Sequence, residues 1–201
     1  TRQMLLDTLP TTFYELVLIA GLSHGTDVWT GNAQDLINKG ICDISHVIGC
    51  RDNIMNDLIA YGVESPLSFQ IMESVRKGKG LKPEWEAEML AHDVPEWYIW
   101  SCKKIKYMFP KAHAAAYVMS AIRLGWYKIY YPMEFYAAFL TVAPGGFDAE
   151  IVGRGKRAVY EMIEIIENKG TEATQKESAL ASTLRLVGEC MARGIKFLPV
   201  D

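Results

Sequence analysis

A stretch that mixes basic, aromatic and small side chains runs from Lys103 to Tyr117 and contains the residues best suited to bind an anion. Pro110 precedes a predicted helix, and alanines 114–116 occupy its first turns. Small side chains let a large ligand approach the backbone there, and the free N–H groups and dipole of a helix N-terminus favour an anion. Lys111 and His113 could therefore contact phosphate. Equally, the alanines could form a close helix-packing face while the lysines are simply solvated.

A second basic cluster, within residues 74–82, has its cations separated by glycines. Flexible glycines between Arg76, Lys77 and Lys79 are typical of a loop that binds nucleic-acid or nucleotide phosphates. Cations in the last turn of a helix are also common, because they interact favourably with the helix dipole. The cluster is not a P-loop, since Glu73 stands where that motif requires a glycine.

The segment Gly21–Asp27 is a short loop rich in hydrogen-bonding side chains. Ser23 beside His24 raises the hypothesis of a small stand-alone hydrolase. Adjacent residues cannot readily supply both an oxyanion hole and a correctly oriented base, and no carboxylate is placed as the third member of a triad. Such a loop more often caps a helix or contacts a bound base or sugar.

Carboxylates that could hold metal ions are not clustered in this sequence. Polymerase and nuclease chemistry needs such clusters for two magnesium ions, and no Asp-x-Asp pair in a strand context occurs. We therefore expect neither a catalytic residue nor a metal ligand. Arg51, beside Asp52, is either half of a charge pair at a helix N-terminus or a phosphate clamp. The four scattered cysteines predict reduced structural thiols.

Helical periodicity dominates the chain, which predicts a mainly α, multi-helix fold and allows for short strand or irregular segments at the termini. Capping-box patterns at Thr12–Glu15 and Thr174–Glu177 should open helices. A long helix is expected over Lys111–Ile129, followed by another that begins at Pro132. These helices must position the basic and aromatic residues.

The break at Pro144–Gly146 predicts a boundary between a nucleotide- and template-facing region, residues 1–143, and a helical scaffold, residues 144–201. In the second region, Val159, Met162, Ile163 and Ile166 form an apolar stripe typical of a helix lying on a core. The sequence starts without methionine and ends in what looks like the start of a new element, so we expect a piece of a larger protein.

Composition narrows the class of protein. The chain has 201 residues, of which 50% are hydrophobic and 22% charged, as in ordinary globular domains. The longest apolar stretches are far shorter than the roughly 20 residues needed to span a bilayer, and no signal peptide is apparent, so we expect a cytoplasmic location and no membrane partner. A net charge of −3 argues against a nucleic-acid binder that works by bulk positive charge.

Four blocks of the sequence resemble consecutive motifs of the PolC-type DNA polymerase III alpha subunit, a family-C replicative polymerase. The blocks are Gly21–Trp29, Val47–Asp52, Ile71–Gly80 and Met108–Val118. Their order and spacing also fit, and the similarity extends over essentially the whole chain. The resemblance implies the fingers region of a DNA-directed DNA polymerase, which binds the incoming dNTP and the template during DNA replication.

Carried over to matching positions, the resemblance implies a set of binding residues. The expected substrate-binding residues, near the nascent base pair and the triphosphate, are Ser23, His24, Thr26, Arg51, Lys111, His113 and Tyr117. The residues expected to contact DNA phosphates are Arg76, Lys77, Lys79, Lys104 and Lys106.

The resemblance also implies partners and a cofactor. Mg²⁺ would be held by palm aspartates of the parent enzyme that are absent from this chain, so the isolated segment should be inactive. Primer-template DNA, dNTP, and the palm and thumb of the parent would be partners, with the sliding clamp reached through downstream regions. The alternative is a helical interaction module with no nucleotide role, for which primed DNA would show no salt-dependent binding.

Overall fold

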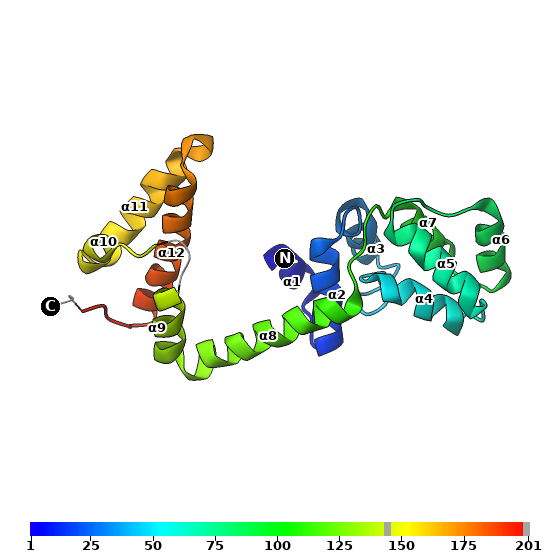
Figure 1. Cartoon of the computed structure of the whole chain (residues 1–201), viewed down its shortest axis with the longest axis horizontal. Helices are drawn as coiled ribbons and strands as arrows, with labels where there is room; N and C mark the ends of the chain where they lie inside the picture. The colour runs from blue at the N-terminus through cyan, green and yellow to red at the C-terminus, as the bar shows by residue number, and fades with distance from the viewer. Residues whose placement is uncertain (143–145, 199–201) are drawn as a thin grey trace. The chain divides into compact units, whose positions relative to one another are not determined.

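The computed structural model describes residues 1–142 and 146–198, and among them it contains twelve α-helices and no β-sheet (Figure 1). The prediction of a mainly α fold is confirmed. Two compact units, Thr1–Ile122 and Arg123–Asp201, divide the chain within one long helix. The boundary predicted at residues 144–146 lies largely outside the described residues and stays a prediction. Residues 199–201 also lie outside the described ranges. No helix in the described ranges has both the length and the apolar content to cross a membrane.

The first unit consists of seven short helices and the beginning of a long one. They are α1 (Arg2–Thr8), α2 (Phe13–His24), α3 (Gln34–Asn38), α4 (Arg51–Ala60), α5 (Ser65–Arg76), α6 (Pro83–Ala91), α7 (Glu96–Lys104) and the start of α8 (Lys111–Tyr130). An irregular turn, Trp29–Ala33, separates α2 from α3 and contains Gly31 at a φ of 70°. Helices α4 and α5 lie side by side (Figure 1).

The N-terminus of α2 has the capping box expected from its sequence. The Thr12 hydroxyl accepts the backbone N–H of Glu15 at 3.2 Å, and a Glu15 carboxylate oxygen accepts the N–H of Thr12 at 3.0 Å. Two N–H groups that the helix leaves unpaired are thereby satisfied. The second predicted box, at Thr174 and Glu177, is confirmed in the same way.

Replacing Thr12 with alanine should lower the free energy of unfolding by about 1 kcal/mol, because the side-chain half of this box is lost. Urea unfolding measures the change. Thr12→Ser keeps the hydroxyl and should lower the free energy of unfolding by only a small part of that amount. Equal losses for the two variants would show that the hydroxyl does not stabilise the helix.

Two apolar clusters hold the first unit together. The larger one packs α4 and α5 against α6 and α7, and includes Ile54, Leu58, Ile71 and Met89. The smaller one consists of Val17, Cys50, Ala114 and Val118 and joins α2 to the first turns of α8. Ala114 is buried in this contact and Ala115 packs against it, whereas Ala116 is exposed, so only part of the alanine run forms a packing face.

The second unit contains the rest of α8, then α9 (Pro132–Val142), α10 (Ala149–Gly153), α11 (Lys156–Asn168), a 3₁₀ turn (Gly170–Glu172) and α12 (Gln175–Ala192). Helices α11 and α12 lie side by side (Figure 1). Their core contains Val159, Ile163, Leu184 and Val187, which confirms the apolar stripe predicted for this region.

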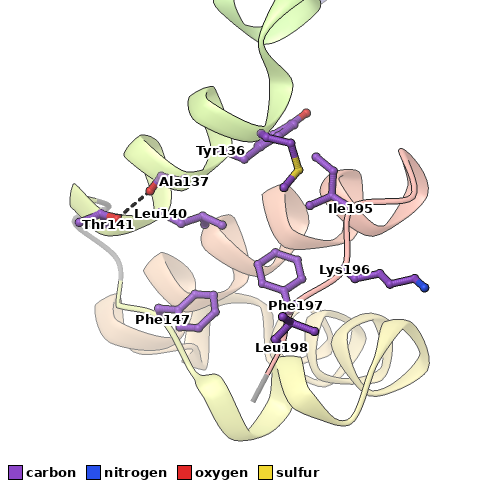
Figure 2. Close-up of a pocket in the computed structure, with 10 residues that line it drawn as sticks. Tyr136, Ala137, Leu140, Thr141, Phe147, Ile195, Lys196, Phe197 and Leu198 are labelled. Atoms are coloured by element: carbon purple, nitrogen blue, oxygen red, sulfur yellow. Dashed lines mark hydrogen bonds between the residues drawn. The ribbon is translucent and has the colours of Figure 1, made fainter. Parts of the chain in front are cut away.

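A cavity of about 460 Å³ lies in the second unit, between α9 and the segment after α12. Its labelled side chains are mostly apolar (Figure 2), with the rings of Phe147 and Phe197 6.1 Å apart. Its lining includes none of the site residues predicted from the sequence. All of those residues lie in the first unit, and the candidate site is described there.

Candidate functional site

The extended segment 105–109 connects the predicted motifs of the first unit. The N–H of Thr26 donates to the carbonyl of Tyr107 at 2.9 Å, and the N–H of Lys106 donates to the carbonyl of Thr26 at 3.1 Å. The N–H of Tyr107 also donates to the carbonyl of Thr26, at 3.3 Å, so Thr26 and Tyr107 form an isolated antiparallel bridge. Short strand-like structure thus occurs in the interior of the chain, where it ties the loop after α2 to the segment before α8.

The same segment also contacts the ends of two other helices. The N–H of Met108 donates to the carbonyl of Arg76, the last residue of α5, at 3.3 Å. The N–H of Arg51, the first residue of α4, donates to the carbonyl of Phe109 at 3.1 Å. All four motifs singled out in the sequence therefore meet along this one segment.

Four rings form a continuous series at the start of α8. The His24 and Phe109 rings are stacked with centroids 5.1 Å apart. The Phe109 and His113 centroids are 4.7 Å apart, and the His113 and Tyr117 centroids are 4.6 Å apart. Both histidines and Tyr117 are exposed, so the series presents aromatic surface to solvent. We call these four residues the ring series.

Ser23 and His24 are arranged as a helix end and not as a nucleophile with its base. The Ser23 hydroxyl donates to the carbonyl of Ala20 at 2.9 Å, and His24 Nδ1 lies 2.7 Å from the same oxygen. A bond to a carbonyl requires a proton on Nδ1, which then cannot accept the serine proton 3.0 Å away. The geometry argues against the hydrolase hypothesis.

Arg51 and Lys111 are the first residues of α4 and α8, and both ends already have a carboxylate nearby. Asp52 Oδ2 accepts the backbone N–H of Lys111 at 2.7 Å and lies 4.0 Å from the Arg51 Nε. The Lys111 ammonium sits 4.7 Å from the centre of the Tyr14 ring. The N-terminus of α8 does attract an anion, as its dipole requires, but in this structure the anion is Asp52.

The basic residues at the end of α5 are paired within their own helix. The Arg76 guanidinium donates to Glu73, with the terminal nitrogen 2.8 Å from Oε2, and the Lys77 ammonium lies 2.9 Å from the same oxygen. Gly78 follows at a φ of 69°, and a Cβ there would lie 2.5 Å from the carbonyl of Lys106. Phosphate would therefore have to compete with Glu73 for these two cations.

The remaining predicted cations differ in how far they are engaged. The Lys104 ammonium donates to the carbonyl of Gly31 at 2.6 Å and sits 4.1 Å from the Trp100 ring centre, so it has a structural role. Lys79 and Lys106 are exposed. Thr26 and Tyr107 hold the backbone of Lys106 in place through the bridge described above, and its side chain is available to solvent.

Comparison with known proteins identifies the region. Residues 1–94 match the family model for the bacterial DNA polymerase III alpha subunit finger domain. Over 200 residues, 100% of this chain, the sequence is 56% identical to DNA polymerase III PolC-type from Bacillus subtilis (strain 168). Identity is 56% to the protein of that name from Listeria monocytogenes serovar 1/2a and 52% to that from Pediococcus pentosaceus. The chain matches a fingers segment of PolC-type DNA polymerase III. It spans 14% of the length of each of these relatives.

Three residues at the candidate site were not among the binding residues predicted from the sequence. Phe109 completes the ring series between His24 and His113, Asp52 occupies the N–H of Lys111, and Tyr14 contacts the Lys111 ammonium. Phe109 and Asp52 both lie within the sequence blocks that resemble PolC motifs, and their place in those blocks could have identified them. Tyr14 lies 97 residues before Lys111 in the sequence, and no local pattern indicated that the two side chains are in contact.

Carboxylates of the fingers segment do not combine into a metal site. Within residues 1–142 and 146–198, no group of three or more His, Cys, Asp or Glu side chains is placed to hold one ion. Asp52 is engaged by Lys111 and Glu73 by Arg76 and Lys77. The carboxylates of the described residues therefore do not fit the pair of magnesium ions that nucleotidyl-transfer chemistry requires.

Glu73 of the fingers segment should remain ionised in acid well below the range of an ordinary glutamate. Hydrogen bonds from Arg76, and then from Lys77, lower the pKa of Glu73 to about 2. A depressed folded pKa stabilises the fold above the unfolded value of about 4.3, and this contribution is lost as pH falls toward the folded pKa. Carboxyl ¹³C NMR titration measures the pKa directly, and a midpoint near 4 would contradict the pairing.

Proposed function

We propose that this segment binds the incoming deoxynucleoside triphosphate and the templating strand in a replicative DNA-directed DNA polymerase during DNA replication. The names of the relatives and the matched finger-domain model support a polymerase parent. The ring series is the observation that carries the nucleotide-binding part of the proposal. It is exposed, aromatic and next to the N-termini of α4 and α8.

The ring series suits a nucleobase because base–aromatic stacking contributes roughly 1–3 kcal/mol per base and tolerates any sequence. Its polar edges can also hydrogen-bond, since the histidines and Tyr117 carry donors and acceptors. Ser23 and Thr26 lie at the loop that leads into the same region, where they would contact the base or sugar.

The cations around the ring series supply the proposed phosphate contacts. Arg51 and Lys111 would interact with the triphosphate, while Arg76, Lys77 and Lys79 would contact template phosphates. Lys106 lies on the bridge segment and Lys104 near its start, and both are proposed DNA contacts. For Arg76, Lys77 and Lys104, DNA would have to displace an existing hydrogen bond or ion pair.

The segment's proposed contribution is positioning. In the parent enzyme a primer 3′ hydroxyl would attack the α-phosphate in line, and Mg²⁺ held by palm residues outside this chain would stabilise the developing charge. A pocket that closes on a correct base pair, with cations on the leaving pyrophosphate, raises both rate and selectivity. Contacts with the palm, the thumb and a sliding clamp, and a cytoplasmic location, belong to the same proposal.

Tyr117→Ala in the parent polymerase tests the proposal. We expect kcat/KM for single-nucleotide incorporation to fall about tenfold, the equivalent of 1.4 kcal/mol of lost stacking. Tyr117→Phe keeps the ring and should retain most of the activity. Tyr130→Ala is the matched control, because this tyrosine is on the same helix and is equally exposed, at 64% against 63% for Tyr117.

Unchanged incorporation by Tyr117→Ala would remove the ring series from the substrate site. The alternative, a helical interaction module, is favoured at one place by the pairing of Arg76 and Lys77 with Glu73. Binding of primed DNA at several salt concentrations separates the two functions. Phosphate contacts give a steep loss of affinity with added salt, whereas a module without nucleotide contacts gives none.

A further inference from the structure

A second cavity in the first unit has a different chemistry from the ring series. It encloses about 260 Å³ and is lined on several sides by aromatic residues, Tyr14, Tyr61, Trp97 and Tyr98. Asp57, on the last turns of α4, also lines it. We call this cavity the Asp57 pocket. None of the predicted nucleotide- or DNA-binding residues lines it.

One oxygen of the Asp57 carboxylate is hydrogen-bonded and the other is accessible to solvent in the pocket. Its Oδ2 accepts the hydroxyl proton of the buried Tyr98 at 2.8 Å. Among the described residues no side chain or backbone group hydrogen-bonds to Oδ1. Burial raises the pKa of Asp57, and the Tyr98 hydrogen bond and the charges of Lys111 and His46 act in the opposite direction. A bound cationic hydrogen-bond donor would take the place of water at Oδ1.

The walls of the pocket favour the same charge. The faces of tyrosine and tryptophan rings are electronegative and attract cations within about 6 Å of the ring centre. Tyr14 already has one cation in this position, since the Lys111 ammonium lies 4.7 Å from its ring centre. The histidine on the lining, His46, has its Nδ1 2.6 Å from Asp43 and is therefore engaged by that carboxylate.

The size of the pocket limits the ligand. Its volume of about 260 Å³ is below the roughly 300–1,000 Å³ typical of sites for drug-sized molecules, so a nucleotide would not be enclosed. A phosphate group would be repelled by Asp57, and an apolar group would leave that carboxylate desolvated and unpaired. A single guanidinium or ammonium group on an alkyl chain fits both the volume and the charge of the pocket.

An adjacent cavity indicates that the cation belongs to a polypeptide. This second space, of about 310 Å³, shares Trp97 with the Asp57 pocket and is also lined by Trp100, Asp35 and Glu96. One lysine, Lys39, lies on the same lining, and the acidic residues outnumber it. Two aromatic and acidic cavities that share one tryptophan suit successive side chains of a chain that carries basic residues.

We propose that the Asp57 pocket binds the guanidinium or ammonium group of an arginine or lysine side chain presented by a polypeptide partner. The charged end would hydrogen-bond to Asp57 and contact the rings, while its alkyl stem packs against the apolar walls. Tyr14 lines this site and also contacts the Lys111 ammonium, so the two proposed sites are neighbours. The test of the pocket does not depend on polymerase activity.

The test uses the 201-residue chain labelled with 5-fluorotryptophan, which gives one ¹⁹F signal for each of its five tryptophans. Trp97→Phe assigns the Trp97 signal. N-acetyl-arginine amide is titrated against the unmodified chain and compared with N-acetyl-citrulline amide, which has the same shape without the charge. We expect a saturable shift of the Trp97 signal with the arginine compound alone.

Two variants locate the interaction. Asp57→Asn keeps an acceptor for the Tyr98 hydroxyl but removes the charge, and it should weaken binding by about tenfold or more. Asp27→Asn is the control, because this exposed carboxylate lines neither cavity. Equal shifts with arginine and citrulline compounds, no shift with either, or undiminished binding by Asp57→Asn would each overturn the proposal.

Discussion

Replacing Arg51 with alanine in the parent polymerase is expected to lower kcat/KM for nucleotide incorporation by roughly 10- to 100-fold, the equivalent of one charge-assisted hydrogen bond. The guanidinium stands at the N-terminus of α4, where its charge and the helix dipole act together on an anion. Its nearest carboxylate, Asp52, is 4.0 Å from Nε and is already bonded to Lys111 at 2.7 Å. The weakly held guanidinium is therefore available to a phosphate.

The variant should leave the ring series in place. The contact that ties α4 to Phe109 is made by the backbone N–H of Arg51, which alanine retains. Single-turnover incorporation at varied nucleotide concentration, together with primer-template affinity, separates loss of nucleotide binding from loss of DNA binding. We expect DNA affinity to be unchanged.

Two further substitutions make the Arg51 result interpretable. Arg51→Lys keeps the charge but loses the planar two-pronged donor, so an intermediate loss is expected if phosphate is bound through two hydrogen bonds. Arg157→Ala is the control, because its side chain is 91% exposed and paired only with Glu161 on α11. Incorporation by Arg51→Ala at the unmodified rate would mean that Arg51 serves only the helix N-terminus.

Gly21→Ala is expected to destabilise the first unit by roughly 1–3 kcal/mol through overpacking. An added Cβ would lie 2.3 Å from the carbonyl oxygen of Gly49 and 2.6 Å from the Cys50 sulfur. Relief would require α2 to move away from the 49–50 backbone, because a carbonyl cannot rotate aside as a flexible side chain can. That movement would also displace the last turn of α2, which contains Ser23 and His24.

Gly125→Ala is the control with the opposite expected sign. Gly125 lies inside α8, and no atom of the described residues beyond its own helix backbone comes within 4 Å of a Cβ built there. Alanine should therefore stabilise the helix by about 0.5–1 kcal/mol, because it reduces the entropy that glycine loses on folding. Native-state hydrogen exchange reports α2 and α8 separately. Equal effects of the two substitutions would rule out a specific clash at Gly21.

Local sequence patterns were enough to predict much of the helical structure. The capping boxes at Thr12 and Thr174, and the start of a helix at Pro132, depend on groups within a few residues of each other. The long helix predicted over Lys111–Ile129 was confirmed with one residue more at its end. The expectation that strand-like segments occur at the termini missed the bridge between Thr26 and Tyr107, because that pairing joins distant parts of the chain.

The sequence by itself determined that the protein is mainly α, which short motifs carry its basic and aromatic residues, and which polymerase family it resembles. These properties follow from local periodicity and from residue identity. Only the tertiary structure decided that His24 stacks on Phe109, that Asp52 occupies the N–H of Lys111, and that Asp57 borders an aromatic pocket. Each of these contacts forms because helices far apart in the sequence pack together. The free energy of that packing comes from buried apolar surface, which no single motif encodes.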